Sequence, residues 1–181
     1  DRVRVSNSAD RNLSHALNVM MKVGDTLNLP RTILESASLT YRKALRNKLV
    51  KGRSIHGVVA ASVYISCKQF GMARTLEEIA GACAIAKKEA GRSYRYVAWE
   101  LSVLSPPTSP EYYVTRFSEQ LELPRSVEIF ALKLLKAAME LRLTSGRGPT
   151  GLAAAVTYVA SLLAGEHKTQ REIAEVAKVT E

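Results

Sequence analysis

"GRSIHGVVAASVYI", residues 52–65, returns later in the chain as "GRGPTGLAAAVTYV", residues 146–159. The two segments lie 94 residues apart, and the same offset aligns residues 27–87 with residues 121–181 without a gap. Of the 61 aligned pairs, 18 are identical. A match of this length indicates that the chain contains two copies of one structural unit.

Two shorter matches mark helix starts inside each copy. "LNLPR" at residues 27–31 corresponds to "LELPR", and "RTLEEIA" at residues 74–80 corresponds to "KTQREIA". The second pair contains Thr75-x-x-Glu78 and Thr169-x-x-Glu172, the pattern of a capping box, in which the threonine and glutamate side chains satisfy two backbone N–H groups. A helix is therefore expected to begin just after each threonine.

The stretch "SPPTSP", residues 105–110, separates the copies, because closely spaced prolines disfavour helix in the residues before them. The expected organisation is a first repeat over residues 1–104, a linker over 105–110 and a second repeat over 111–181. The composition is 46% hydrophobic but only 6% aromatic, and alanine is abundant. Together with i, i+3, i+4 apolar spacing, this favours an all-α fold.

Apolar periodicity and breakers predict five helices in the first repeat, with a central helix surrounded by the others. Ser54 is the expected N-cap of the third helix, and Pro149 falls in the first turn of its counterpart, where a missing N–H costs nothing. Small residues in this helix would let neighbouring helices approach closely. The predicted helices lie near residues 9–27, 31–48, 54–70, 75–82 and 87–101.

The two cysteines, Cys67 and Cys83, lack paired C-x-x-C spacing and sit in apolar helical surroundings, so buried free thiols in a reducing compartment are expected. No signal peptide and no apolar run of 18 residues is visible, which predicts a soluble intracellular protein. The first residue is not Met, and the end does not read as a natural helix end. A fragment of a longer protein is therefore expected.

Catalysis is poorly supported by the sequence. His15, His56 and His167 are scattered and form no metal-binding or nucleophile arrangement. "GRSIHG" lacks the lysine of a phosphate-binding loop and has no strand before it. We expect a protein that is not an enzyme and holds no metal.

The net charge of +9, with an isoelectric point near 9.7, predicts attraction to a polyanion or an acidic protein. Residues 1–108 hold 17 Lys and Arg against 8 Asp and Glu, whereas residues 109–181 hold 9 of each. The window 42–53 alone has six basic residues and no acid. Many basic proteins bind no nucleic acid, so the charge alone leaves a solvated basic surface as an alternative.

The fourth and fifth predicted helices of the first repeat are separated by a short turn, and the fifth is basic. This arrangement resembles a helix-turn-helix whose second helix would lie along DNA. On that helix one face is apolar and expected to be buried: Ala90, Tyr94, Val97 and Leu101. Another face is basic and aromatic: Lys88, Arg92, Arg95 and Trp99, with Lys87 adding a charge at the helix start. A solvated basic face is the alternative interpretation here too.

Taken together, "GRSIHGVVAASVYI", "RTLEEIA", "KKEAGRSYRYV" and the whole segment from "GRGPTG" to the end resemble the core of transcription factor IIB, most closely its archaeal form. The resemblance covers essentially the whole chain. It implies a pair of tandem five-helix cyclin boxes, the second ending before its last helix. It also implies binding to the complex of TATA-binding protein with promoter DNA, on both sides of the TATA element, and bridging to RNA polymerase.

The resemblance also implies roles for individual positions. The basic fifth helix would face DNA downstream of the TATA element, the loop before the third helix would lie near phosphates and the TATA-binding protein, and two segments of the second repeat would approach upstream DNA. The implied DNA-binding residues are Lys51, Arg53, Ser54, Lys87, Lys88, Arg92, Arg95, Arg147, Lys168, Thr169, Gln170 and Arg171. The implied contacts to the TATA-binding protein are Arg42, Lys43, Lys51 and Arg53.

Two parts of the family pattern are missing from this sequence. The zinc ribbon and reader segment that engage polymerase lie outside it, so no cofactor is expected in this chain. The fifth helix of the second repeat, which reads bases in the family, is also absent, so an exposed apolar face and reduced sequence specificity are expected. We expect a monomer when free, located in the cytoplasm with the nucleoid if archaeal and in the nucleus if eukaryotic.

A second hypothesis is a cyclin-type module that binds only protein, because cyclin boxes share a fold across different tasks. The feature that separates the two is the positive charge of the first repeat and its basic fifth helix, which a purely protein-binding cyclin does not need. Retention of a kinase instead of a TATA-binding protein would favour this alternative.

Overall fold

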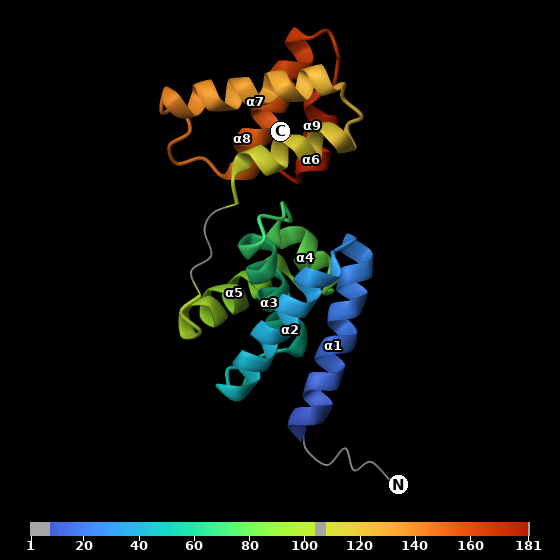
Figure 1. The fold of residues 1–181 in the computed structure, drawn as a ribbon, viewed down its shortest axis with the longest axis vertical. Coiled ribbons are helices and arrows are strands. Elements are labelled where there is room, and N and C mark those ends of the chain that lie inside the picture. The colour runs from blue at the N-terminus through green and yellow to red at the C-terminus, as the bar shows by residue number, and fades with distance from the viewer. Residues whose placement is uncertain (1–7, 104–107, 181) are drawn as a thin grey trace. The chain divides into compact units, whose positions relative to one another are not determined.

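The computed structural model describes residues 8–103 and 108–180, and within these ranges the chain forms nine α-helices and no β-strand (Figure 1). The all-α prediction is therefore confirmed. Residues 105–107 of the expected linker lie outside the described residues. The helix α6 begins at Pro110, the last residue of that expected linker.

Contacts between residues divide the chain into two compact units, residues 1–107 and 108–181. Unit 1 contains five of the described helices, and their bounds are α1 Ser8–Leu27, α2 Arg31–Arg46, α3 Ile55–Gln69, α4 Leu76–Ala82 and α5 Lys87–Glu100. Unit 2 contains four, with bounds α6 Pro110–Gln120, α7 Arg125–Glu140, α8 Pro149–Leu163 and α9 Gln170–Ala177. The starts of α2 to α5 differ by at most one residue from those predicted.

The third helix of unit 1, α3, is the central element predicted from the sequence. It packs against α1, α2, α4 and α5, and its middle is buried on nearly every side. Gly57, Ala60 and Ala61 are among the buried residues, so small side chains do allow close helix packing. A helix that is apolar all round must be enclosed in this way.

Local capping signals fix where the two central helices begin. Ser54 is the N-cap of α3, and its Oγ accepts a hydrogen bond from the Gly57 N–H at 2.9 Å. In α8 the N-cap is Gly148 and Pro149 occupies the first turn. Both starts were predicted, because these signals act within a few residues of the helix end.

Both predicted capping boxes are present. In α4 the Thr75 Oγ1 accepts from the Glu78 N–H at 3.2 Å, while the Thr75 N–H donates to Glu78 Oε2 at 2.8 Å. In α9 the corresponding distances, between Thr169 and Glu172, are 3.2 and 2.7 Å. The same device therefore starts the fourth helix of each unit.

The α9 box predicts a pH dependence. Hydrogen bonds from the Thr169 backbone and side chain hold the pKa of Glu172 below its usual value, which is about 4.3. Because the folded-state pKa is the lower one, the cap stabilises α9 above about pH 4.3, and this stabilisation is lost as the pH falls through the folded-state pKa. NMR titration of the Glu172 carboxyl should show this lowered pKa.

Thr169→Ala should raise the pKa of Glu172 only part of the way to its ordinary value. The reason is that the backbone N–H of residue 169, which is the larger cause, remains. A pKa of Glu172 that does not change in this variant would contradict the role assigned to the hydroxyl.

The two central helices differ in how much of their surface is covered. In unit 1, α5 covers the side of α3 that includes Gly57 and Tyr64. At the equivalent side of α8, Gly151 and Ala155 are exposed. Three larger apolar side chains of α8 are also exposed, Val159, Leu162 and Leu163. The exposed apolar face expected in unit 2 lies along this side of α8.

Both cysteines are buried and free, as predicted. Burial raises the pKa of the Cys67 thiol to about 12 and that of the Cys83 thiol to about 12, so both stay protonated near neutral pH. Unreactive thiols are expected from such burial. Within the described ranges, no helix is both long and apolar enough to cross a membrane.

Candidate nucleic-acid interface

The loop before α3 and the first two turns of α5 come together around a small cavity in unit 1. Its volume is about 310 Å³, and it is lined by Gly52, Arg53, Ser54, Glu89, Arg92 and Ser93. Gly52 has a φ of +70°, a left-handed conformation that favours glycine, so it lets the loop turn toward α5. Three of the predicted DNA-binding residues, Arg53, Ser54 and Arg92, are thus neighbours although they are far apart in sequence.

Arg53 is held against α5 by an aromatic ring. Its guanidinium carbon lies 3.7 Å from the centroid of the Tyr96 ring, a close cation–π contact. This contact fixes the charge beside the helix and reduces the entropy that Arg53 would lose on binding an anion. Sequence reasoning assigned no role to Tyr96, because nothing local links it to a residue 43 positions earlier.

Ser54 has a structural role in the free protein. Its hydroxyl donates to Glu89 Oε1 at 2.5 Å and accepts from the Gly57 N–H, so it joins the start of α3 to α5. Glu89 is a carboxylate inside an otherwise cationic site, and its place there was not predicted. A phosphate approaching Ser54 would have to displace this carboxylate or bind beside it.

The fifth helix has the two faces that its sequence predicted. Ala90 and Val97 are buried, and Tyr94 and Leu101 are half-buried. The Tyr94 ring packs edge-on against Tyr64 of α3, with ring centroids 4.8 Å apart, and its hydroxyl accepts from Lys68 Nζ at 3.1 Å. Tyr94 is therefore part of the core packing.

The basic side chains of α5 are not equivalent. Lys88, Arg92 and Arg95 are exposed, and none of them takes part in an ion pair with another described residue. Lys87 differs, because its Nζ lies 2.7 Å from Glu77 Oε2 of α4. Part of the Lys87 charge is already compensated, so the other three cations are better placed to attract phosphate.

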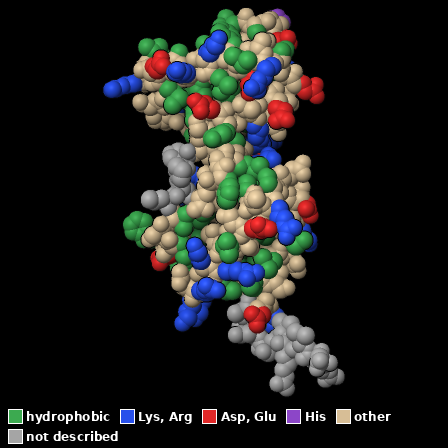
Figure 2. Space-filling view, in the orientation of Figure 1, with side chains coloured by type: hydrophobic (Ala, Val, Ile, Leu, Met, Phe, Trp, Pro, Cys, Tyr) green, Lys and Arg blue, Asp and Glu red, His purple; other side chains and the backbone are tan. Residues whose placement is uncertain are grey.

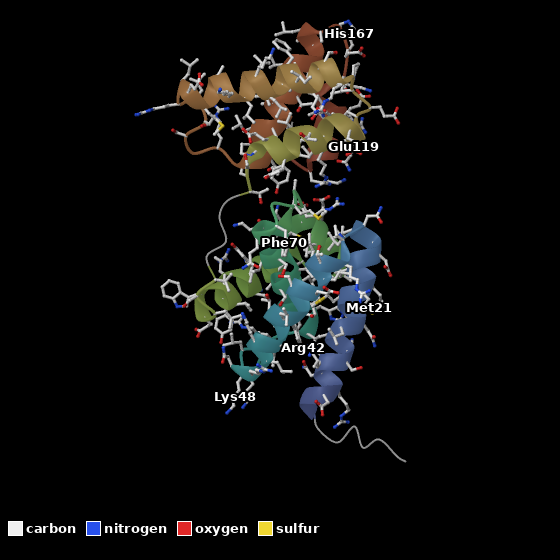
Figure 3. All side chains as sticks on the ribbon, in the orientation of Figure 1. Met21, Arg42, Lys48, Phe70, Glu119 and His167 are labelled. Carbon is white, nitrogen blue, oxygen red and sulfur yellow. The ribbon has the colours of Figure 1, made fainter. Side chains whose placement is uncertain are left out.

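A second group of cations lies at the end of α2 and in the turn after it. Arg42 and Lys43 are on α2, Lys48 follows in the turn, and all three are exposed. Figure 3 labels Arg42 and Lys48. Lys51, also exposed, continues this group toward Arg53. Figure 2 shows Lys and Arg side chains gathered over this end of unit 1. The four predicted contacts to the TATA-binding protein thus lie on α2 or in the loop that joins it to α3.

The predicted residues of unit 2 do not form a single site. Arg147 precedes α8 and the run 168–171 follows it, so about 20 Å of helix lies between them. Thr169 is engaged in its capping box, and Arg171 Nε lies 3.1 Å from Glu175 Oε1. Lys168 is half-buried, whereas Arg147 and Gln170 are exposed.

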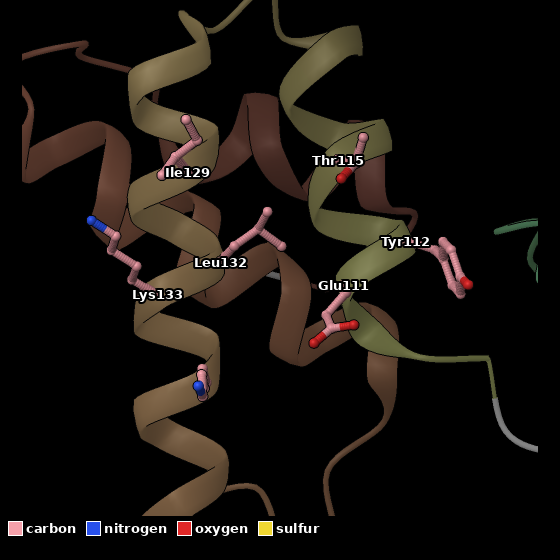
Figure 4. A pocket seen from close by; sticks show the side chains of 7 residues that line it. Glu111, Tyr112, Thr115, Ile129, Leu132 and Lys133 are labelled. Carbon is pink, nitrogen blue, oxygen red and sulfur yellow. The ribbon is translucent and has the colours of Figure 1, made fainter.

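Unit 2 also has a shallow groove between α6 and α7 that was not predicted (Figure 4). Its volume is about 440 Å³. Ile129 and Leu132 provide apolar surface, Glu111 lies at the start of α6, and Lys133 extends from α7 away from α6. The full lining is Glu111, Tyr112, Thr115, Ile129, Leu132, Lys133 and Lys136. No residue predicted from the sequence as a binding residue lies in this groove.

The part of the chain that the structure describes contains no candidate metal site. No group of three or more His, Cys, Asp or Glu side chains there is placed to hold a metal ion. His15 and His56 do come together, with ring centroids 5.8 Å apart, but as a pair only.

Two tandem helical units of one design, the first with a cationic face, define a cyclin-like helical-repeat protein. The transcription factor TFIIB repeat matches residues 9–99 and again residues 104–181. The chain therefore belongs to the TFIIB repeat family, which confirms the resemblance drawn from its motifs. Membership in this family agrees with the prediction of a protein that is not an enzyme.

Several relatives carry the name transcription initiation factor IIB. The protein of Archaeoglobus fulgidus is 50% identical over 180 residues, which cover 99% of this chain and 55% of that protein. The protein of Methanosarcina mazei is 49% identical, with 99% and 53% covered. The protein of Methanocaldococcus jannaschii is 51% identical, with 99% and 27% covered. The chain thus spans about half the length of the first two and about a quarter of the third.

Proposed function

We propose that this chain is the core of a general transcription initiation factor, which binds the complex of TATA-binding protein with promoter DNA. Unit 1 supplies most of the affinity for the DNA backbone, because it carries all of the net positive charge. The observation that carries the proposal is the exposed cationic face of α5, joined to Arg53 by the Tyr96 contact, on a TFIIB repeat.

The proposed contacts divide between the two units. Arg53, Arg92 and Arg95 bind phosphates downstream of the TATA element, with Lys51, Ser54, Lys87 and Lys88 nearby. Arg42 and Lys43, together with Lys51 and Arg53, face acidic side chains of the TATA-binding protein. In unit 2, Arg147 and the run Lys168, Thr169, Gln170 and Arg171 approach upstream DNA. Binding of this chain to bare DNA is expected to be weak, because it rests mainly on ionic contacts with phosphates, and salt weakens such contacts.

A mobility-shift experiment tests this function directly. A labelled duplex with a TATA element is mixed with TATA-binding protein, with this chain, or with both. We expect a slower-migrating ternary complex only when both proteins are present, and a matched duplex with a scrambled TATA element as the control should give none. If the chain adds nothing to the shift given by the TATA-binding protein, the proposal fails.

Two further parts of the proposal concern the full-length factor. It recruits and orients RNA polymerase on the promoter, a role suggested by the name that its relatives carry. Its site of action is the nucleoid in the cytoplasm, if its source is archaeal like these relatives. Retention of a kinase, with no ternary complex, would instead favour a cyclin-type protein-binding module.

A further inference from the structure

Trp99 is the single tryptophan of the chain, and it lies in the last turn of α5 with 82% of its surface exposed. One exposed apolar residue needs no explanation by itself. Trp99 does call for an explanation, because it is the largest apolar side chain in the protein and folding buries almost none of it. Its position on the helix suggests what that explanation is. Among the described residues, none forms an aromatic or cation–π pair with its ring.

Trp99 lies on the same side of α5 as Lys88, Arg92 and Arg95, which together form the cationic stripe of this helix. At 100° per residue, Lys88, Arg92, Arg95 and Trp99 fall within a sector of about 60° on one side of the helix. Ala90 and Val97, by contrast, are buried on the other side. Trp99 lies about 6 Å further along the helix axis than Arg95, which is less than two base-pair rises of duplex DNA. An extended ligand that follows this side of the helix past both arginines therefore reaches the indole.

The charges on this stripe favour a nucleic acid as the ligand. Three cations with no acid in the same sector suit a polyanion, and the DNA backbone places apolar deoxyribose faces between its phosphates. We propose that the indole of Trp99 packs against deoxyribose next to the phosphates held by Arg92 and Arg95. This proposal rests on the proposed function, and it adds a contact that carries no charge.

An uncharged contact has a distinct signature in binding experiments. Trp99→Ala should weaken the ternary complex about tenfold. This is the loss of affinity expected if roughly a third of the indole surface is buried against DNA in the complex. The loss should be the same at every salt concentration, because no counterion is involved. Arg95→Ala should instead lower the salt slope by about one. Trp99→Phe, which keeps an aromatic ring, should recover most of the affinity.

The single tryptophan also allows a direct test. 5-Fluorotryptophan is incorporated into this chain only, so that its ¹⁹F NMR signal reports Trp99 while the anisotropy of labelled DNA reports ternary complex formation. We expect the signal to shift when the complex forms on a duplex that extends well beyond the TATA element. On a duplex that ends at the TATA element the shift should be absent.

The outcomes separate the two proposals. A ternary complex that forms with no ¹⁹F shift overturns the Trp99 contact and leaves the proposed function standing. Another contrary result is a ¹⁹F shift caused by the TATA-binding protein without DNA, or by the ternary complex on the duplex that ends at the TATA element. Either form of this result assigns Trp99 to a protein partner and overturns the proposed Trp99 contact with DNA. Failure to form any ternary complex overturns the proposed function, and the Trp99 contact with it.

Discussion

Replacing both Arg92 and Arg95 with alanine should weaken the ternary complex about a hundredfold near 0.1 M salt. Each arginine that neutralises a phosphate releases about one counterion, so the slope of log affinity against log salt should become shallower by about two. Both side chains are exposed and take no part in the core, so the helix content should not change. The measurement is DNA anisotropy between about 50 and about 200 mM salt.

The matched control is the double variant Lys133→Ala and Lys136→Ala. It removes the same charge from an exposed helix surface, but on α7 of unit 2, in a groove that contains none of the proposed DNA contacts. Its salt slope should stay that of the unaltered chain. Equal losses in the two double variants would mean that only total charge matters, and would contradict a DNA-facing α5.

Gly57→Val should destabilise unit 1 by about 3 kcal/mol, near the upper end of the usual range for overpacking. A Cβ at this position would lie 2.8 Å from Ser93 Oγ and 2.9 Å from Ser54 Oγ. Neither oxygen moves freely, because Ser54 caps α3 and Ser93 is buried on α5. Urea denaturation followed by circular dichroism measures the loss, and hydrogen exchange of the α3 amides locates it in unit 1.

The repeat supplies an internal control for this substitution. Gly151 is the equivalent residue of α8, and a Cβ there would meet nothing within 4 Å. Gly151→Val should change the free energy of unfolding by less than about 0.5 kcal/mol, since valine is no worse than glycine in a helix. If both substitutions had the same effect, close contact between α3 and α5 would not be the reason for glycine at position 57.

Much of the fold could be predicted because its signals are local. The capping boxes at Thr75 and Thr169, the serine cap at Ser54 and the proline at position 149 each act within one helical turn. Helix periodicity also separated the buried and exposed faces of α5. The repeat then supported the capping box, because both copies carry it at the same position.

The details of the site could not be predicted, because they depend on how helices cross. The hydrogen bond from Ser54 to Glu89 joins residues 35 positions apart, and the contact of Arg53 with Tyr96 spans more. Likewise, nothing in the sequence shows that Lys87 is paired with Glu77 of α4 while Arg92 is not. Sequence reasoning identified a basic helix, whereas the structure distinguishes its compensated charge from its available charges.

The uneven distribution of charge between the two units has a kinetic consequence. Residues 1–108 hold the whole excess of Lys and Arg, and the rest of the chain is neutral. A polyanion at a distance therefore exerts a net attraction on unit 1 and almost none on unit 2, which favours encounters through unit 1. Productive encounters should begin with unit 1, and salt should slow the association rate more than it speeds dissociation.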